Sequence, residues 1–91
     1  MTEAQQRTQT RDAILQDLEA AAPISLRLET LGGGIRRVHA INVTDGEIKK
    51  HLDYLIEKGL VEETASKISA GDKRYKLTGD GRDYLESEGL I

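Results

Sequence analysis

Hydrophobic positions recur at helical spacing in four parts of the chain and alternate with polar positions in one. In the first part, Ile14 and Leu18 are four residues apart and Leu15 flanks them. An apolar stripe that repeats every three or four residues predicts an amphipathic helix, for which Thr10 is the expected N-cap. Residues 1–10 are polar and lack this periodicity. They are expected to form a flexible polar tail or a frayed helical extension.

A second helix is predicted from about Ser25, and one or two residues of strand before it are left open. Its apolar residues follow at steps of three or four and are Leu28, Leu31, Ile35 and Val38. Three consecutive glycines at 32–34 weaken this prediction, because each glycine costs ~1 kcal/mol relative to alanine within a helix. Three alternatives remain: the helix breaks at the glycines, it starts late, or the glycines allow close helix packing.

The third helix has the most distinct boundaries in the sequence. Thr44 is its expected N-cap and Glu47 stands three residues later, which is the pattern of a capping box. The apolar stripe consists of Ile48, Leu52, Leu55 and Ile56. Gly59 is the expected C-terminal stop, and the β-favouring pair Leu60-Val61 follows at once. This junction predicts a tight corner in which Leu60 is buried and Val61 begins a strand.

A β-hairpin is predicted after this corner, because charged residues alternate with Tyr75 and Leu77 near a turn signal at 71–72. With a two-residue loop at 71–72, Ile68 faces Tyr75 and Lys67 faces Lys76. One face of the hairpin is then apolar and the other basic.

A last helix is predicted at about 79–88, with Thr78 as its N-cap and Gly89 as its stop. The order helix, helix, helix, hairpin, helix predicts one mainly α domain of the α+β class over residues 11–91. Ninety-one residues are enough for a single small domain.

The sequence resembles a known family in two runs of residues: Leu52-x-x-Leu55-x-x-x-Gly59-Leu60-Val61 and Arg74-Tyr75-Lys76-Leu77-Thr78-x-x-Gly81-Arg82. Both are similar to the winged helix-turn-helix of bacterial regulators of the PadR, MarR and ArsR types. The resemblance implies three helices, a two-stranded antiparallel wing and a C-terminal helix. It also implies a DNA-binding architecture, with Thr44 to Lys50 in the major groove and the hairpin on the backbone or the minor groove. With its long second-helix region and small size, the chain also resembles short Mu-like bacteriophage proteins described as regulators.

The formal net charge of −3 disfavours a nucleic-acid partner, but the charge is unevenly distributed. Residues 35–51 carry four Lys/Arg and two Asp/Glu, and residues 64–78 carry four and one. Phosphate contacts require local cations, whereas acidic surfaces beyond ~8–10 Å are screened. The candidate DNA-binding residues are therefore Arg36, Arg37, Thr44, Lys49, Lys50, Lys67, Lys73, Arg74 and Lys76. The alternative for these charges is a solvated helix face and protected edge strands.

Other chemistry finds little support in the sequence. The chain has no cysteine, and His39 and His51 are too far apart for helical metal-ligand spacing, so no metal site is expected. His51 borders the apolar stripe of the third helix and is expected to be a half-buried packing residue. The glycines at 32–34 lack the Gly-Lys-Ser/Thr ending of a phosphate-binding loop. We expect no enzyme activity and no cofactor.

Two functions remain open. The first is sequence-directed binding of double-stranded DNA by a transcription regulator of bacterial or phage origin, with homodimerisation undecided. The second is a winged-helix protein-interaction module that binds a protein partner and does not touch DNA. No apolar run approaches the ~18 residues of a membrane span and no signal peptide is present, so a cytoplasmic protein is expected.

Overall fold

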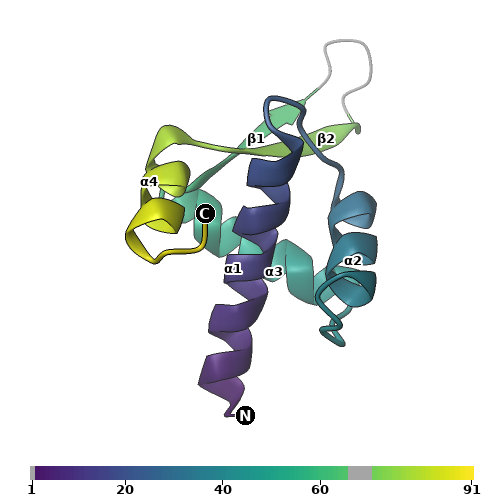
Figure 1. The fold of residues 1–91 in the computed structure, drawn as a ribbon. Coiled ribbons are helices and arrows are strands. Elements are labelled where there is room, and N and C mark those ends of the chain that lie inside the picture. The colour runs from purple at the N-terminus through teal and green to yellow at the C-terminus, as the bar shows by residue number, and fades with distance from the viewer. Residues whose placement is uncertain (1, 66–70) are drawn as a thin grey trace.

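The computed structural model describes residues 2–65 and 71–91, which form four helices and one two-stranded antiparallel sheet (Figure 1). The elements in chain order are α1 (Glu3–Ala21), α2 (Leu28–Arg37), α3 (Asp45–Glu57), β1 (Val61–Ala65), β2 (Lys73–Leu77) and α4 (Gly79–Ser87). This order confirms the predicted succession of three helices, a hairpin and a last helix. Within these residues, no helix has the length and hydrophobicity that a membrane span needs.

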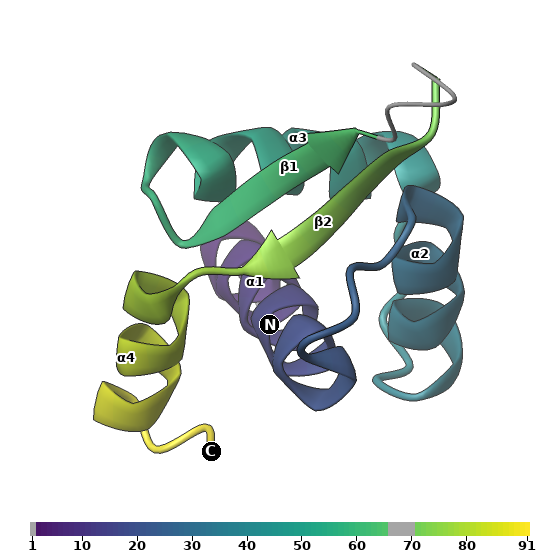
Figure 2. The ribbon, with the colours of Figure 1, turned by 90° about the horizontal axis from the view of Figure 1, so that it is seen from above.

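Helix α1 is the central element of the fold. Its second half presents Ile14, Leu15 and Leu18 to the core, where all three are buried. Helices α2 and α4 lie on either side of α1, and the sheet crosses its C-terminal end (Figures 1 and 2). The rest of the core is aliphatic apart from Tyr75, as expected for a chain with no Phe or Trp.

The start of α1 differs from the prediction. Thr2, and not Thr10, is the N-cap: the Thr2 side chain accepts a hydrogen bond from the Gln5 amide, and the Gln5 side chain accepts one from the Thr2 amide. Thr10 is buried within the helix, where its hydroxyl donates to the carbonyl oxygen of Gln6 at 2.8 Å. The polar residues before it are therefore helical turns. Residues 2–9 are all exposed, so they bear no apolar stripe from which the helix could have been predicted.

The three glycines do not interrupt α2, which is continuous from Leu28 to Arg37. A Cβ atom at Gly32 would overlap the Asp45 carboxylate, and one at Gly34 would lie 3.0 Å from the Asp17 carboxylate. The glycines therefore allow close packing of α2 against side chains from α3 and α1. The residue of strand that was left open before α2 is present, because Leu26 forms an isolated bridge with Tyr75.

The hairpin register also differs from the prediction. Tyr75 lies opposite Glu63, and Lys76 lies opposite Glu62. The predicted pairing of Tyr75 with Ile68 and of Lys76 with Lys67 is therefore wrong; residues 67 and 68 themselves lie outside the described residues. Strand β1 ends at Ala65 and strand β2 begins at Lys73, so 71–72 is not a two-residue hairpin loop.

The corner between α3 and β1 is confirmed. Gly59 adopts a positive φ of 78°, the conformation that a helix-terminating glycine supplies, and the Leu60 amide donates to the carbonyl oxygen of Leu55. Val61 is buried and begins the strand. Leu60, which was predicted to be buried, is only half-buried and packs on the edge of the core.

The last helix begins and ends as predicted. The Thr78 hydroxyl accepts from the Gly81 amide at 3.0 Å and donates to the carbonyl oxygen of Gly59 at 2.7 Å. Gly89, with φ 69°, follows the end of α4. Thr78 thus joins the start of α4 to the corner after α3.

Candidate nucleic-acid interface

The N-terminal half of α3 is held rigidly and leaves one face open. The predicted capping box is present: the Thr44 hydroxyl accepts from the Glu47 amide at 3.1 Å, and the Glu47 carboxylate accepts from the Thr44 amide at 3.4 Å. Ile48 is fully buried on the inner side, whereas Gly46 and Lys50 are exposed on the outer side. The site residues Thr44 and Lys50 therefore both lie on the surface, although Thr44 is occupied by its capping role.

Lys49 lies on the side of α3 that faces the hairpin. Its ammonium group forms an ion pair with Asp53 one turn later, and this hydrogen bond raises the pKa of Lys49. Burial raises the pKa of the nearby Tyr75 hydroxyl. The Asp53 carboxylate therefore partly neutralises the positive charge of Lys49 before any ligand approaches.

The two arginines at the end of α2 have structural partners. Arg36 donates to the carbonyl oxygen of Val43 at 3.1 Å and pairs with Asp45 at 2.8 Å, which fastens the turn between α2 and α3. Arg37 donates to the carbonyl oxygen of Gly33 within its own helix at 3.2 Å. Arg36 is thus a residue that positions α3.

The hairpin does not present a basic face in the part of it that the structure describes. Each of its three described cations has a carboxylate within 4.0 Å, in the pairs Lys73–Glu63, Arg74–Asp72 and Lys76–Glu62. The predicted basic face is therefore wrong for residues 61–65 and 71–77, whereas the opposite face buries Val61 and Tyr75 in the core as an apolar face would. The antiparallel pairing places acidic β1 residues beside basic β2 residues. Lys67 lies outside the described residues.

Four described Lys or Arg side chains have no carboxylate within 4.0 Å: Arg11, Arg37, Lys50 and Lys58. Three of them lie along the groove between α1 and α3. Lys50, Tyr54 and Lys58 follow one another at steps of four on α3, and the Arg11 guanidinium from α1 lies 3.8 Å from the centre of the Tyr54 ring. Sequence analysis missed Arg11 and Tyr54; the spacing of 50, 54 and 58 was the available signal.

Two adjacent hollows follow this groove. One, of about 440 Å³, is bordered by Arg7 and Arg11 from α1 and Lys50 from α3; the other, of about 420 Å³, is bordered by Arg11, Tyr54 and Lys58. His51 lies beside Arg11, whose Nε donates to its Nδ1 at 3.3 Å. Burial, and then the Arg11 charge, lower the pKa of His51, so the expectation of a half-buried packing histidine is confirmed.

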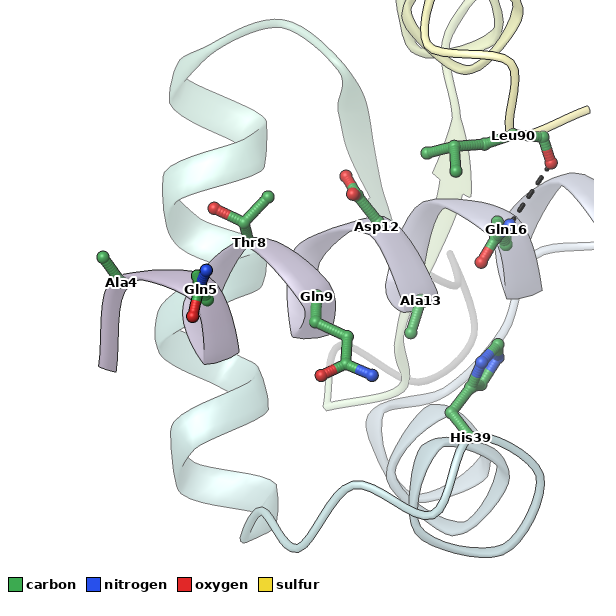
Figure 3. A pocket seen from close by; sticks show the side chains of 9 residues that line it. All are labelled: Ala4, Gln5, Thr8, Gln9, Asp12, Ala13, Gln16, His39 and Leu90. Atoms are coloured by element: carbon green, nitrogen blue, oxygen red, sulfur yellow. Dashed lines mark hydrogen bonds between the residues drawn. The ribbon is translucent and has the colours of Figure 1, made fainter. Parts of the chain in front are cut away.

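A further hollow of about 540 Å³ lies along α1, where His39 and Leu90 approach it (Figure 3). Gln16 donates to the carbonyl oxygen of Leu90 at 3.2 Å, and His39 bonds the Asp17 carboxylate at 2.8 Å. Small and amide side chains form most of its lining. Within residues 2–65 and 71–91, no three His, Cys, Asp or Glu side chains are grouped as a metal site.

No protein-family model matches the sequence, and no curated protein matches it. Solved structures do match the fold. A PadR family transcription regulator from Clostridium difficile R20291 superposes with a TM-score of 0.66 and 20% identity, over 86% of this chain and 83% of that chain.

Two regulators of the MarR type match at lower scores. The adhesin competence repressor AdcR of Streptococcus pyogenes has a TM-score of 0.59 and 18% identity, over 89% of this chain and 58% of that chain. A MarR family transcription regulator has a TM-score of 0.59 and 19% identity, over 96% of this chain and 63% of that chain. The chain thus spans less than two thirds of these two regulators and has the winged helix-turn-helix fold that all three share.

Proposed function

We propose that this protein binds double-stranded DNA and regulates transcription, with the N-terminal half of α3 in the major groove and the hairpin on the backbone. The observation that carries this proposal is the open outer face of α3. Capping and core contacts fix the helix while Gly46 and Lys50 stay exposed, and the fold is that of transcription regulators. A helix held in this way can enter a major groove without rearrangement.

The paired cations remain available to phosphate. Exposed ion pairs contribute only ~0–1 kcal/mol, so Lys49, Lys73, Arg74 and Lys76 can exchange a carboxylate for a phosphate oxygen at small cost. We assign phosphate contacts to these four, to Arg37 and to Lys67, and sequence discrimination to Lys50 and Thr44.

The same proposal includes where the protein acts and in which oligomeric state. It needs no catalytic group and no cofactor, and it places the chain in the cytoplasm of a bacterium or in a bacteriophage system. Because operators are usually read as paired half-sites, we propose that a homodimer binds the full site.

The test is fluorescence anisotropy of a labelled duplex titrated with protein over a range of salt concentrations. We expect affinity to fall with salt with a log–log slope of about −0.9 for each phosphate neutralised. Lys50→Ala should change the ranking among duplexes of different sequence. Lys76→Ala should instead weaken all duplexes alike. Glu86→Gln on α4 is the control and should leave the ranking unchanged. Absence of binding at low salt would refute the proposal.

A second candidate is favoured by one observation, the neutralised hairpin. Glu62, Glu63 and Asp72 each lie beside a hairpin cation and would face any phosphate that approaches. A mixed surface of this kind suits a protein partner, for which the fold is also used. The variant Glu62→Gln distinguishes the two candidate functions. It should strengthen DNA binding but weaken a contact with a protein partner of complementary charge.

A further inference from the structure

We infer that the duplex backbone is also bound on the side of α3 opposite the hairpin, by Arg7, Arg11, Tyr54 and Lys58 from α1 and α3, which continue the surface from Lys50 in the groove. We call this surface the α1-side row. It deepens the proposed function and rests on it, and it extends the interface to α1, from which the sequence suggested no DNA-binding residue.

The first step in the argument is the state of the cations. Arg11, Lys50 and Lys58 have no carboxylate within 4.0 Å among the described residues, in contrast to the described hairpin cations, each of which has one. A cation without an acidic partner can bind a phosphate without first losing an ion pair. The most available positive charge of the described interface therefore lies in this groove and not on the hairpin.

The second step is the arrangement of Arg11. Its guanidinium stacks on Tyr54 and its Nε is used by His51, so the side chain is held in one place. The two terminal nitrogens of the planar guanidinium keep their donors, and such a fork suits phosphate oxygens. Tyr54 is 38% exposed and its ring stacks with Arg11. The Lys58 ammonium lies 5.6 Å from the centre of the same ring.

The third step is the state of the nearby carboxylates. Each of the three that border the two hollows is already engaged: Glu3 pairs with Arg7 at 3.6 Å, Glu47 belongs to the capping box, and Asp12 accepts from the Tyr84 hydroxyl at 2.8 Å. Glu57 remains exposed on the outer face of α3 beside the row. The negative charge of Glu57 opposes the binding of phosphate, so removing this charge should strengthen DNA binding.

The fourth step is the length of the row. Lys50 lies on α3 and Lys58 is the C-cap residue of the same helix, eight residues later, which corresponds to ~12 Å at the rise of an α-helix. One DNA strand presents a phosphate about every 3.4 Å of duplex axis. The row is therefore long enough to contact more than one phosphate of one strand while the outer face of α3 occupies the adjacent groove.

The test measures the affinity and salt slope of single variants by anisotropy with a labelled random-sequence duplex. Arg7→Gln and Lys58→Gln each remove one charge from residues that do not support the core. The matched control is Arg82→Gln, which removes the same charge from α4, where Arg82 pairs with Glu19. Circular dichroism melting confirms that each variant is folded.

We expect Arg7→Gln and Lys58→Gln each to weaken binding about two- to tenfold and to make the log–log slope shallower by about one. Arg82→Gln should leave the slope unchanged, Lys58→Arg should keep wild-type affinity, and Glu57→Gln should strengthen binding. If folded Arg7→Gln and Lys58→Gln bind like wild type while Lys76→Ala is weakened, the α1-side row is refuted and the proposed function stands. If the wild-type protein does not bind DNA at low salt, both are refuted.

Discussion

Gly81 is a position at which a side chain would collide with the backbone. It is buried in the first turn of α4, and a Cβ atom there would overlap the carbonyl oxygen of Leu60 and the side chain of Leu77. Because the Leu60 oxygen belongs to the backbone, it cannot rotate away as a side chain could. Gly81 is thus required for the close approach of α4 to the corner after α3.

We predict that Gly81→Ala lowers the free energy of unfolding by about 1–3 kcal/mol through overpacking. The measurement is urea denaturation followed by circular dichroism. The control is Gly79→Ala two residues earlier, where nothing lies within 4 Å of the added Cβ atom. Gly79→Ala should be neutral or slightly stabilising, since it restricts the unfolded chain. Equal losses in both variants would contradict the prediction.

His51 makes stability depend on pH. Burial and the nearby Arg11 lower its pKa from the ordinary value of about 6.5, so just below that pH the native state binds fewer protons than the unfolded state. We therefore predict that the free energy of unfolding falls as the pH is lowered through about 6.5. Arg7 acts in the same direction as Arg11, and Glu47 opposes it.

The contribution of His51 is measured by urea denaturation between neutral and mildly acidic pH. His51→Gln should flatten the decline in the free energy of unfolding that begins near pH 6.5. The control His39→Gln should leave the His51 contribution to this decline in place. A decline of the same size in His51→Gln would assign the effect to other groups.

At the scale of the elements, the sequence determined which segments become helices and strands wherever a segment packs on the core. The capping box at Thr44, the stop at Gly59 and the cap at Thr78 are local chemistry and were predicted. The first turns of α1 were missed, because residues 2–9 are all exposed and therefore form no apolar stripe. The register of β1 against β2 was missed, because Tyr75 is also held by Leu26 from a distant part of the chain.

The hairpin register can be tested by cross-linking, since the chain has no cysteine of its own. Glu62 and Lys76 lie directly opposite each other, and residues so paired have Cα atoms at a distance that a disulfide can span. We predict that the double variant Glu62→Cys with Lys76→Cys forms an intramolecular disulfide under mild oxidation, detected by mass and by gel mobility.

The comparison is Glu63→Cys with Lys76→Cys. These neighbouring positions project from opposite faces of the sheet, because successive strand residues alternate. The offset pair should oxidise much more slowly. Faster oxidation of the offset pair would show that the register is shifted by one residue.

At the scale of the whole molecule, charge is rearranged by folding. In the sequence, Glu62 and Glu63 belong to an acidic stretch, residues 52–63, with one Lys/Arg and four Asp/Glu, and Lys73 and Lys76 belong to the basic stretch 64–78. Antiparallel pairing brings the two stretches together, so the hairpin is mixed where the structure describes it. In the same way, α1 belongs to a net-negative stretch but contributes Arg7 and Arg11 to the groove beside α3.

The two halves of α1 should differ in stability. Residues 2–9 are exposed and extend away from the body of the protein in Figure 1, whereas Ile14, Leu15 and Leu18 are in the core. We predict that amides in the second half exchange with solvent hydrogen only on global unfolding. Amides near residues 7–9 should exchange through local fraying, measured by native-state hydrogen exchange. Equal protection in both halves would imply a packing partner for the first turns, such as a second copy of the chain.

The sequence by itself determined the order of elements, the caps at Thr44 and Thr78, the stops at Gly59 and Gly89, the aliphatic core and the resemblance to winged-helix regulators. These follow from interactions between residues close in the chain or from the periodicity of burial. The tertiary structure alone decided the strand register, the role of Arg36 in the turn, the pairing of the hairpin cations and the meeting of Arg11 with Tyr54. The physical reason is that the charge a ligand meets depends on partners in space, and these partners come from segments far apart in the sequence.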